Sequence, residues 1–149
     1  MKTSSVIRIL GRYIFAVLLS YSLASLFSTQ SVVASLYDLD IPVTWAERWQ
    51  MSLHDLAAMA GMFLPMVAAG FAIALPMAAW LGRRLPARRS LLYALAGAAG
   101  LIAIHLSLET AFDLIPVAGA RTPLGLAAQA VAGAVGGYCF AALGRRPLL

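Results

Sequence analysis

The stretch LGLAAQAVAGAVGGYCFAAL, residues 124–143, decides the fold class because it is almost wholly apolar and carries no charge. About 20 such residues span a hydrocarbon core of roughly 30 Å as a helix. In lipid the backbone must satisfy its own hydrogen bonds, so a stretch of this kind should be helical. Three further stretches are also predominantly apolar, although two of them contain acidic residues. We therefore expect membrane spans at about residues 13–36, 53–80, 91–114 and 124–143.

The composition of the whole chain agrees with this interpretation. Of its 149 residues, 62% are hydrophobic and 11% are charged, whereas roughly a quarter of the residues of a soluble domain are charged. We expect one all-α domain over residues 1–149, an integral membrane four-helix up-down bundle. The net charge of +5 does not indicate nucleic-acid binding, because the arginines lie in short clusters beside the apolar stretches. There they act as topology signals and contact the lipid bilayer.

The distribution of charge predicts the orientation of the chain. An arrangement with both termini in the cytoplasm places nine of the eleven basic residues on one side of the membrane. All six acidic residues then lie on the other side. This positive-inside pattern predicts a multi-pass protein of a bacterial inner membrane with cytoplasmic N and C termini. The basic residues of the inner side are Lys2, Arg8, Arg12, Arg83, Arg84, Arg88, Arg89, Arg145 and Arg146.

Two spans carry features that qualify this scheme. The basic head and small residues of the first span also resemble a cleavable signal peptide, and cleavage would leave three spans. The second span is longer than the bilayer core, and Pro65 and Pro76 favour kinks inside it.

The outer segment 37–52 contains two tryptophans among charges, which is typical of the membrane–water interface. We expect a short interfacial helix there, with Asp40 or Thr44 as its cap.

Polar residues gather in the outer half of the expected bundle. On the third span His105, Glu109 and Asp113 recur every four residues and share one helical face. Ionisable groups at membrane depth are costly and usually face protein or water. We therefore expect an outward-facing polar cluster that draws on all four spans. Its candidate members are Thr29, Gln30, His54, Asp55, His105, Glu109, Asp113, Arg121 and Gln129.

Three chemical interpretations of this cluster stay open. His54, His105 and Glu109 are ligand types that suit zinc, iron or manganese, although no signature spacing accompanies them. Haem between the two histidines is disfavoured, because their depths differ by roughly 10 Å. A path for protons or a small solute along the third span is another interpretation. No cofactor is predicted.

The fourth interpretation is structural. Polar contacts between helices, such as His105 with Gln129, Thr29 or Glu109, hold membrane helices in register. Arg121 is placed to pair with an acid across the short outer loop, either Glu109 or Asp113. None of these contacts requires a ligand.

Small residues recur every four positions along the fourth span and form a stripe for close helix packing. The stripe consists of Gly125, Gly133, Gly137 and Ala141, with Gln129 in the same register. Packing inside one bundle explains it, and the alternatives are a homo-oligomer or a larger membrane partner.

The sequence has no P-loop, no G-x-S-x-G and no H-E-x-x-H motif. Its one cysteine, Cys139, cannot form an internal disulfide. The layout, with Thr29-Gln30, His54-Asp55 and Ala120-Arg121 before Gly136-Gly137, resembles an uncharacterised group of small four-helix proteins of the bacterial inner membrane. That resemblance implies the fold and no activity.

We therefore expect a non-enzymatic accessory or scaffold subunit that contacts a membrane partner through its small-residue faces and its tryptophan-bearing outer loop. A transporter or channel-like protein with an outward-facing polar cavity is the first alternative. A metal- or haem-binding redox subunit is the second.

Overall fold

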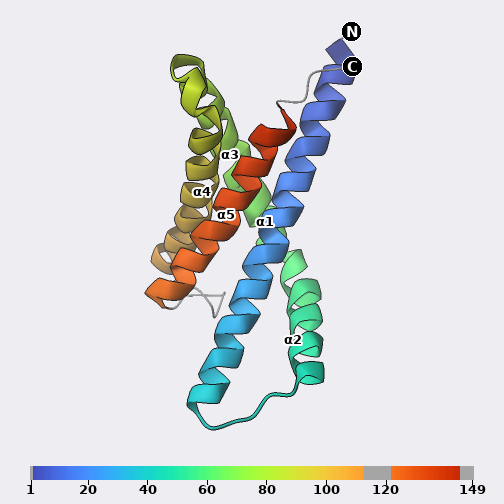
Figure 1. Ribbon diagram of the computed structural model, residues 1–149, viewed down its shortest axis with the longest axis vertical. Helices are drawn as coiled ribbons and strands as arrows, with labels where there is room; N and C mark the ends of the chain where they lie inside the picture. The colour runs from blue at the N-terminus through green and yellow to red at the C-terminus, as the bar shows by residue number, and fades with distance from the viewer. Residues whose placement is uncertain (1, 113–121, 145–149) are drawn as a thin grey trace.

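The computed structural model describes residues 2–112 and 122–144, and this part of the chain contains helices and no strand (Figure 1). Four of the described helices, α1, α3, α4 and α5, are long and apolar enough to cross a membrane, so the chain is a multi-pass membrane protein. The elements are α1 (Lys2–Asp38), α2 (Trp45–Ala58), a 3₁₀ turn (Met59–Gly61), α3 (Phe63–Arg84), a second 3₁₀ turn (Pro86–Arg88), α4 (Arg89–Phe112) and α5 (Pro123–Leu143).

The end of α1 is closed by a backbone motif centred on Asp40. Asp40 has a φ of 58°, in the left-handed region that short polar residues tolerate. The N–H groups of Asp40 and Ile41 donate to the carbonyls of Tyr37 and Leu36, both at 3.0 Å. This pair of hydrogen bonds is a Schellman motif, which satisfies carbonyls that the helix end would otherwise leave unpaired. Asp40 therefore ends α1 and does not cap the helix that follows.

Thr44 caps α2, which confirms one of the two caps that the sequence predicted. The Thr44 side chain accepts a hydrogen bond from the backbone N–H of Glu47, and the Glu47 carboxylate accepts from the Thr44 backbone at 2.8 Å. This reciprocal pair is a capping box, which satisfies two donors at once. The short helix predicted in segment 37–52 is thus confirmed, and it runs on to Ala58.

The expectation of one continuous span over residues 53–80 is wrong. The chain leaves the α-helical path after Ala58, makes a 3₁₀ turn, and starts α3 at Phe63. Pro65 therefore lies in the first turn of α3, where the N–H that proline lacks has no intrahelical partner to lose. Pro76 does lie inside α3, as expected.

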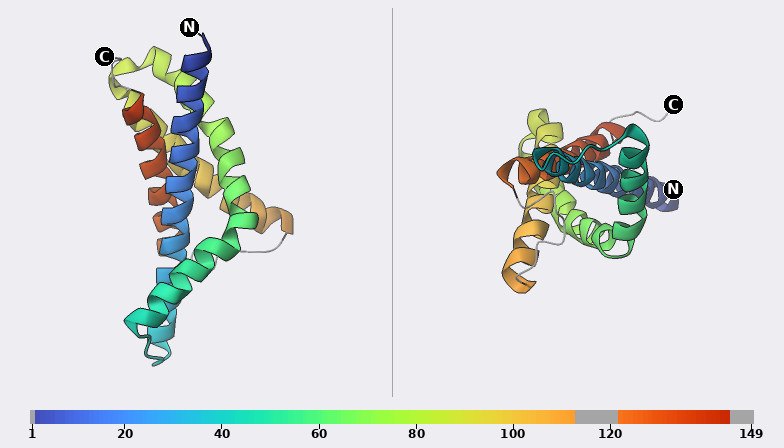
Figure 2. Two further views of the ribbon diagram at one scale, coloured as in Figure 1. Left: turned by 90° about the vertical axis from the view of Figure 1, so that its right-hand side faces the viewer. Right: turned by 90° about the horizontal axis from the view of Figure 1, so that it is seen from below.

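Consecutive membrane helices alternate in direction, and α5 lies between α1 and α4 (Figure 1). The closest packing is between α4 and α5, followed by α1 with α5 and α3 with α4. The start of α1, the turn between α3 and α4, and the end of α5 lie at one end of the bundle, which we call the basic end (Figures 1 and 2). The other end carries α2 and the last turns of α1.

Glycine pairs explain the tight contact of α5 with α4. A Cβ atom built on Gly133 would lie 2.2 Å from the carbonyl oxygen of Gly97, and a Cβ on Gly97 would lie 2.1 Å from the carbonyl oxygen of Gly133. A Cβ on Gly137 would lie 2.0 Å from the carbonyl oxygen of Tyr93. Real Cβ atoms do not approach backbone this closely, so these positions allow backbone contact that alanine would prevent.

Candidate functional site

The second half of α1 and the whole of α2 form a two-helix arm, and the far end of this arm extends beyond the rest of the bundle (Figure 1). The length of this extension follows from the register of α1 and α5, which two hydrogen bonds fix. The hydroxyl of Ser20 donates to the carbonyl of Ala132 at 3.1 Å, and the amide of Gln129 donates to the carbonyl of Ala24 at 3.0 Å. Since the helices are antiparallel, the start of α5 comes level with about residue 30 of α1. The last eight or so residues of α1 then project by about 12 Å.

Three contacts fix α2 and the 3₁₀ turn that follows it against α1. The Tyr21 hydroxyl donates to the carbonyl of Leu56 in the last turn of α2, where carbonyls lack intrahelical partners. The Thr29 hydroxyl donates to the carboxylate of Asp55 at 2.8 Å and also contacts the carbonyl of Ser25 at 3.1 Å. Ser25 in turn contacts the sulfur of Met59 at 3.9 Å. The arm is therefore held at its base by polar contacts between two helices.

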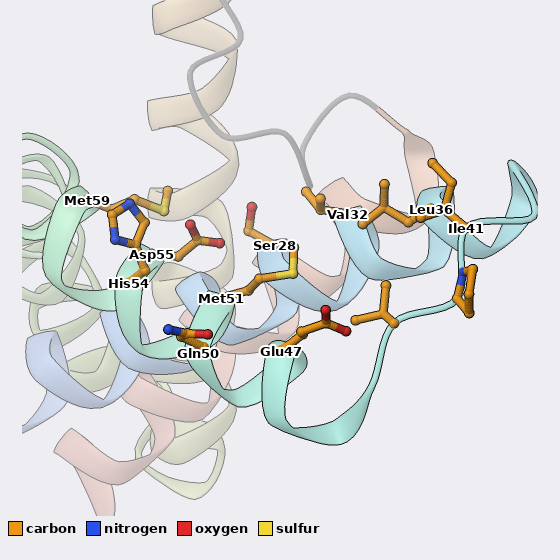
Figure 3. Close-up of a pocket in the computed structure, with 12 residues that line it drawn as sticks. Ser28, Val32, Leu36, Ile41, Glu47, Gln50, Met51, His54, Asp55 and Met59 are labelled. Atoms are coloured by element: carbon orange, nitrogen blue, oxygen red, sulfur yellow. The ribbon is translucent and has the colours of Figure 1, made fainter.

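A groove of about 790 Å³ lies between the two helices of the arm (Figure 3). Its α1 side is formed by Ser28, Val32 and Leu36, and its α2 side presents Glu47, Gln50, Met51, His54, Asp55 and Met59. The surface is mixed, since apolar side chains alternate with two carboxylates and an imidazole.

The two carboxylates give the groove its negative charge, but both already accept hydrogen bonds within the chain. Asp55 is half-buried and accepts the Thr29 hydrogen bond. Glu47 belongs to the capping box, and the Thr44 hydroxyl, with a smaller contribution from the Thr44 backbone, holds the pKa of Glu47 below its usual value. A carboxylate that stays ionised while satisfying a helix start is explained by its structural role.

A second polar group lies deeper, between α3, α4 and α5. His105 is buried, and its ring packs on Phe63 with a centroid distance of 5.6 Å. Gln129 is fully buried and approaches His105, yet no hydrogen bond of regular geometry joins them. Both ring nitrogens of His105 and the side-chain oxygen of Gln129 lack a hydrogen-bond partner among the described residues. Neither side chain lines the arm groove.

The predicted polar cluster is therefore divided in the structure. Thr29 contacts Asp55, and His105 approaches Gln129, while Gln30 is half-buried and His54 lies exposed on α2. Glu109 is exposed on the last turns of α4, which diverge from α1 (Figure 2). Asp113 and Arg121 lie outside the described residues, and so does their suggested pairing.

The structure assembles no set of metal ligands within the described ranges. There, no group of three or more His, Cys, Asp or Glu side chains is close enough to hold a metal ion. His54 is exposed on the arm, whereas His105 is buried in the bundle. The residues considered for a metal or haem, His54, His105 and Glu109, thus occupy different parts of the fold.

The small-residue stripe of α5 is used inside the chain. Gly125, Gly133, Gly137 and Ala141 are all buried, and the glycines at 133 and 137 contact the α4 backbone. Sequence reasoning missed a second close approach, at Gly136, where an added Cβ would lie 2.7 Å from the carbonyl oxygen of Ala16 on α1. The signal for it was present in the adjacent glycines 136 and 137, which face two different neighbours.

The outer face of α2 is the remaining feature that bears on function. Trp45, Trp49 and Leu53 are spaced four residues apart, which places them on one face of the helix. Their side chains are 74%, 64% and 63% exposed, so this face lies away from the bundle. We call these three residues the tryptophan face.

Comparisons with models of protein families, with curated proteins and with solved structures found no match, so the site has to be interpreted from its own chemistry.

Proposed function

We propose that the chain is a non-enzymatic membrane scaffold subunit that presents its α1–α2 arm to a membrane-protein partner on the outer side of a bacterial inner membrane. The observation that carries this proposal is the tryptophan face, an exposed apolar stripe on a helix that polar contacts hold in place. Exposed apolar patches mark protein–protein or membrane interaction sites, and we propose a protein partner for this one. Tryptophan is also the residue most enriched among those that dominate binding energy at interfaces.

The orientation in this proposal rests on the separation of charge. Arg83, Arg84, Arg88 and Arg89 surround the turn between α3 and α4 at the basic end. The acids of the described residues lie at the opposite end, in the last turn of α1, in the turn after it, in α2 and in the last turn of α4. The positive-inside rule then places the basic end, with both chain termini, in the cytoplasm and the arm outside.

The structure changes where we expect the partner to bind. The stripe of α5 was one of the two surfaces expected to contact a partner, and its glycines are covered by α4 within the same chain. The tryptophan-bearing outer segment, the other expected surface, is exposed. We therefore propose that the partner binds the arm.

Partner capture from gently solubilised membranes tests the proposal. The variant Trp45→Ala/Trp49→Ala is compared with Trp80→Ala, which removes another exposed tryptophan (58%) from α3 near the basic end. We expect a stoichiometric partner with the wild-type chain and with the Trp80 variant, and its loss from the arm variant. A photo-crosslinking residue at position 49 should form an adduct with the same partner. Retention of the partner by the arm variant would contradict the proposal.

A transport function is the second candidate, and the buried, unpaired polar atoms of His105 and Gln129 favour it. Unsatisfied polar groups at membrane depth are costly unless water or a solute reaches them. The test is labelling of His105→Cys, in a Cys139→Ser background, by a water-soluble thiol reagent added from the arm side. Labelling would support a water-filled path, and protection would leave the His105–Gln129 pair as a packing contact.

A further inference from the structure

A second groove, unrelated to the arm, opens near the basic end between α1, α3 and α4. It has a volume of about 520 Å³, within the range of small-molecule sites. Its floor consists of the buried side chains of Phe71, Leu75 and Tyr93. Its rim on α1 includes Ile9 and Leu10, which are 52% and 53% exposed. An apolar groove with exposed apolar walls in a membrane helix bundle is open to lipid chains.

Pro76 lies at the α3 side of this groove and gives a local reason for the opening. A proline inside a helix removes one backbone donor and favours a bend. On the far side of the groove, the Tyr13 hydroxyl donates to the carbonyl of Ala68 and joins α1 to α3. The two helices are thus connected at Tyr13 and leave the groove between them toward the basic end.

Two arginines from different helices meet at the same groove. Arg12 of α1 and Arg89 of α4 both line it. Their guanidinium nitrogens flank one point at the end of α5, because a Cβ built on Gly144 would lie 3.2 Å from Arg12 Nη1 and 3.5 Å from Arg89 Nη2. Arg89 is further oriented by Tyr93, whose ring centroid lies 5.6 Å from the guanidinium carbon. The two charges are therefore placed side by side.

The end of α5 alone does not account for this pair. A helix C-terminus carries about half a negative charge, whereas the two arginines carry two positive charges. The described acids, Asp38, Asp40, Glu47, Asp55 and Glu109, all belong to the opposite end of the fold. The groove therefore joins an apolar interior to a pair of guanidinium groups whose charge the described acids do not balance.

We infer that this groove binds one anionic phospholipid from the leaflet on the basic side. Its phosphate would lie between Arg12 and Arg89, and an acyl chain would lie on Phe71 and Leu75. Basic pockets between membrane helices on the cytoplasmic side select anionic headgroups in this way. Arginine suits the role because its planar fork matches phosphate oxygens. The bound lipid would fasten α1 to α4 where the helices are not packed directly.

Native mass spectrometry of the purified full-length chain tests this inference. The probes are phosphatidylglycerol and phosphatidylcholine of identical acyl chains, added to detergent micelles, with inorganic phosphate as a competitor. We expect one retained phosphatidylglycerol, little phosphatidylcholine, and no displacement by millimolar phosphate. Displacement by phosphate would show an anion site without lipid specificity and would overturn the inference.

Charge-matched variants provide the control. Arg12→Gln/Arg89→Gln should weaken phosphatidylglycerol binding about 30-fold, since each basic residue near a membrane surface contributes roughly 5-fold. Arg83→Gln/Arg84→Gln removes the same charge from the same end but from residues that do not line the groove, and it should bind like the wild type. Equal weakening in both variants would show diffuse attraction and refute a defined site.

A third variant separates loss of the lipid site from misfolding. Ala72→Leu fills the groove from its exposed α3 side without changing charge. Leucine favours helices nearly as well as alanine, so α3 should fold normally. We expect loss of the retained lipid with an unchanged circular dichroism spectrum, and lipid retention in this variant would contradict a site inside the groove.

Discussion

Replacing Gly133 by alanine tests the close packing of α4 and α5 quantitatively. The new methyl group would lie 2.2 Å from the carbonyl oxygen of Gly97 and 2.7 Å from its carbonyl carbon. Both are backbone atoms, so no side-chain rotation can relieve the clash and the helices must separate. Overpacking of this kind costs about 1–3 kcal/mol, whereas alanine gains up to about 1 kcal/mol over glycine in helix propensity. With the full propensity gain the net loss is up to about 2 kcal/mol, and a variant that gains the same propensity without overpacking should be about 1–3 kcal/mol more stable than Gly133→Ala.

Gly100→Ala is the matched control on α4. Its added Cβ would lie 3.5 Å from the Cβ of Ala74, an ordinary contact. We expect this variant to be as stable as the wild type or up to about 1 kcal/mol more stable, because only the propensity term remains. The assay is unfolding in mixed micelles with increasing SDS, followed by far-UV circular dichroism. If Gly133→Ala were as stable as Gly100→Ala, the two backbones would not be in contact and the packing described above would be wrong.

Two further predictions concern the arm. Tyr21→Phe should destabilise the chain by about 1 kcal/mol in the same assay, because it leaves the Leu56 carbonyl without the hydroxyl; Tyr37→Phe, whose exposed hydroxyl can be replaced by water, should have a smaller effect. The pKa of Glu47 is lowered in the folded chain, so its contribution to α2 is complete above the ordinary glutamate pKa and is lost as the pH falls through the lower folded value. Cα chemical shifts of residues 45–48 should lose helical character over that acidic range, and Thr44→Ala should remove this pH dependence. A first turn that stays helical in acid would contradict the capping role of the ionised carboxylate.

The helical spans were predictable where composition alone decides the structure. The expected span 91–114 begins two residues after α4 does, and its end lies outside the described residues; the expected span 124–143 differs from α5 by one residue at its start. Such stretches have one way to satisfy their backbone in lipid. Thr44 was predictable as a cap because a Glu follows it at the third position of the helix.

The break between α2 and α3 was not predicted, although the sequence contains its cause. Residues 56–64 are apolar without interruption, so hydropathy continues through the turn. Pro65 restricts the residue before it and removes the donor that would bond the carbonyl of Gly61. A proline in this position is typical of a first helical turn. Interpreting Pro65 as a helix start would have placed the boundary near Phe63.

The grouping of the polar residues could not be predicted from helical periodicity. Spacing places His105 and Glu109 on one face of α4, but the end of α4 diverges from α1, so His105 is buried and Glu109 is exposed. Which residues of different helices meet depends on crossing geometry, which the glycine contacts at 97, 133 and 137 set. The basic groove depends on the same geometry, since Arg12 and Arg89 are far apart in the sequence.

The central claim is that the arm lies on the outer side of the membrane, and thiol labelling tests this claim most directly. In a Cys139→Ser background, Gln50→Cys lies on the exposed surface of α2 and Ala87→Cys lies in the turn between α3 and α4. A membrane-impermeant maleimide is applied to spheroplasts before and after permeabilisation. We expect Gln50→Cys to be labelled on intact spheroplasts and Ala87→Cys only after permeabilisation. Labelling of Ala87→Cys on intact spheroplasts, with Gln50→Cys protected, would reverse the orientation and contradict the proposed outer arm.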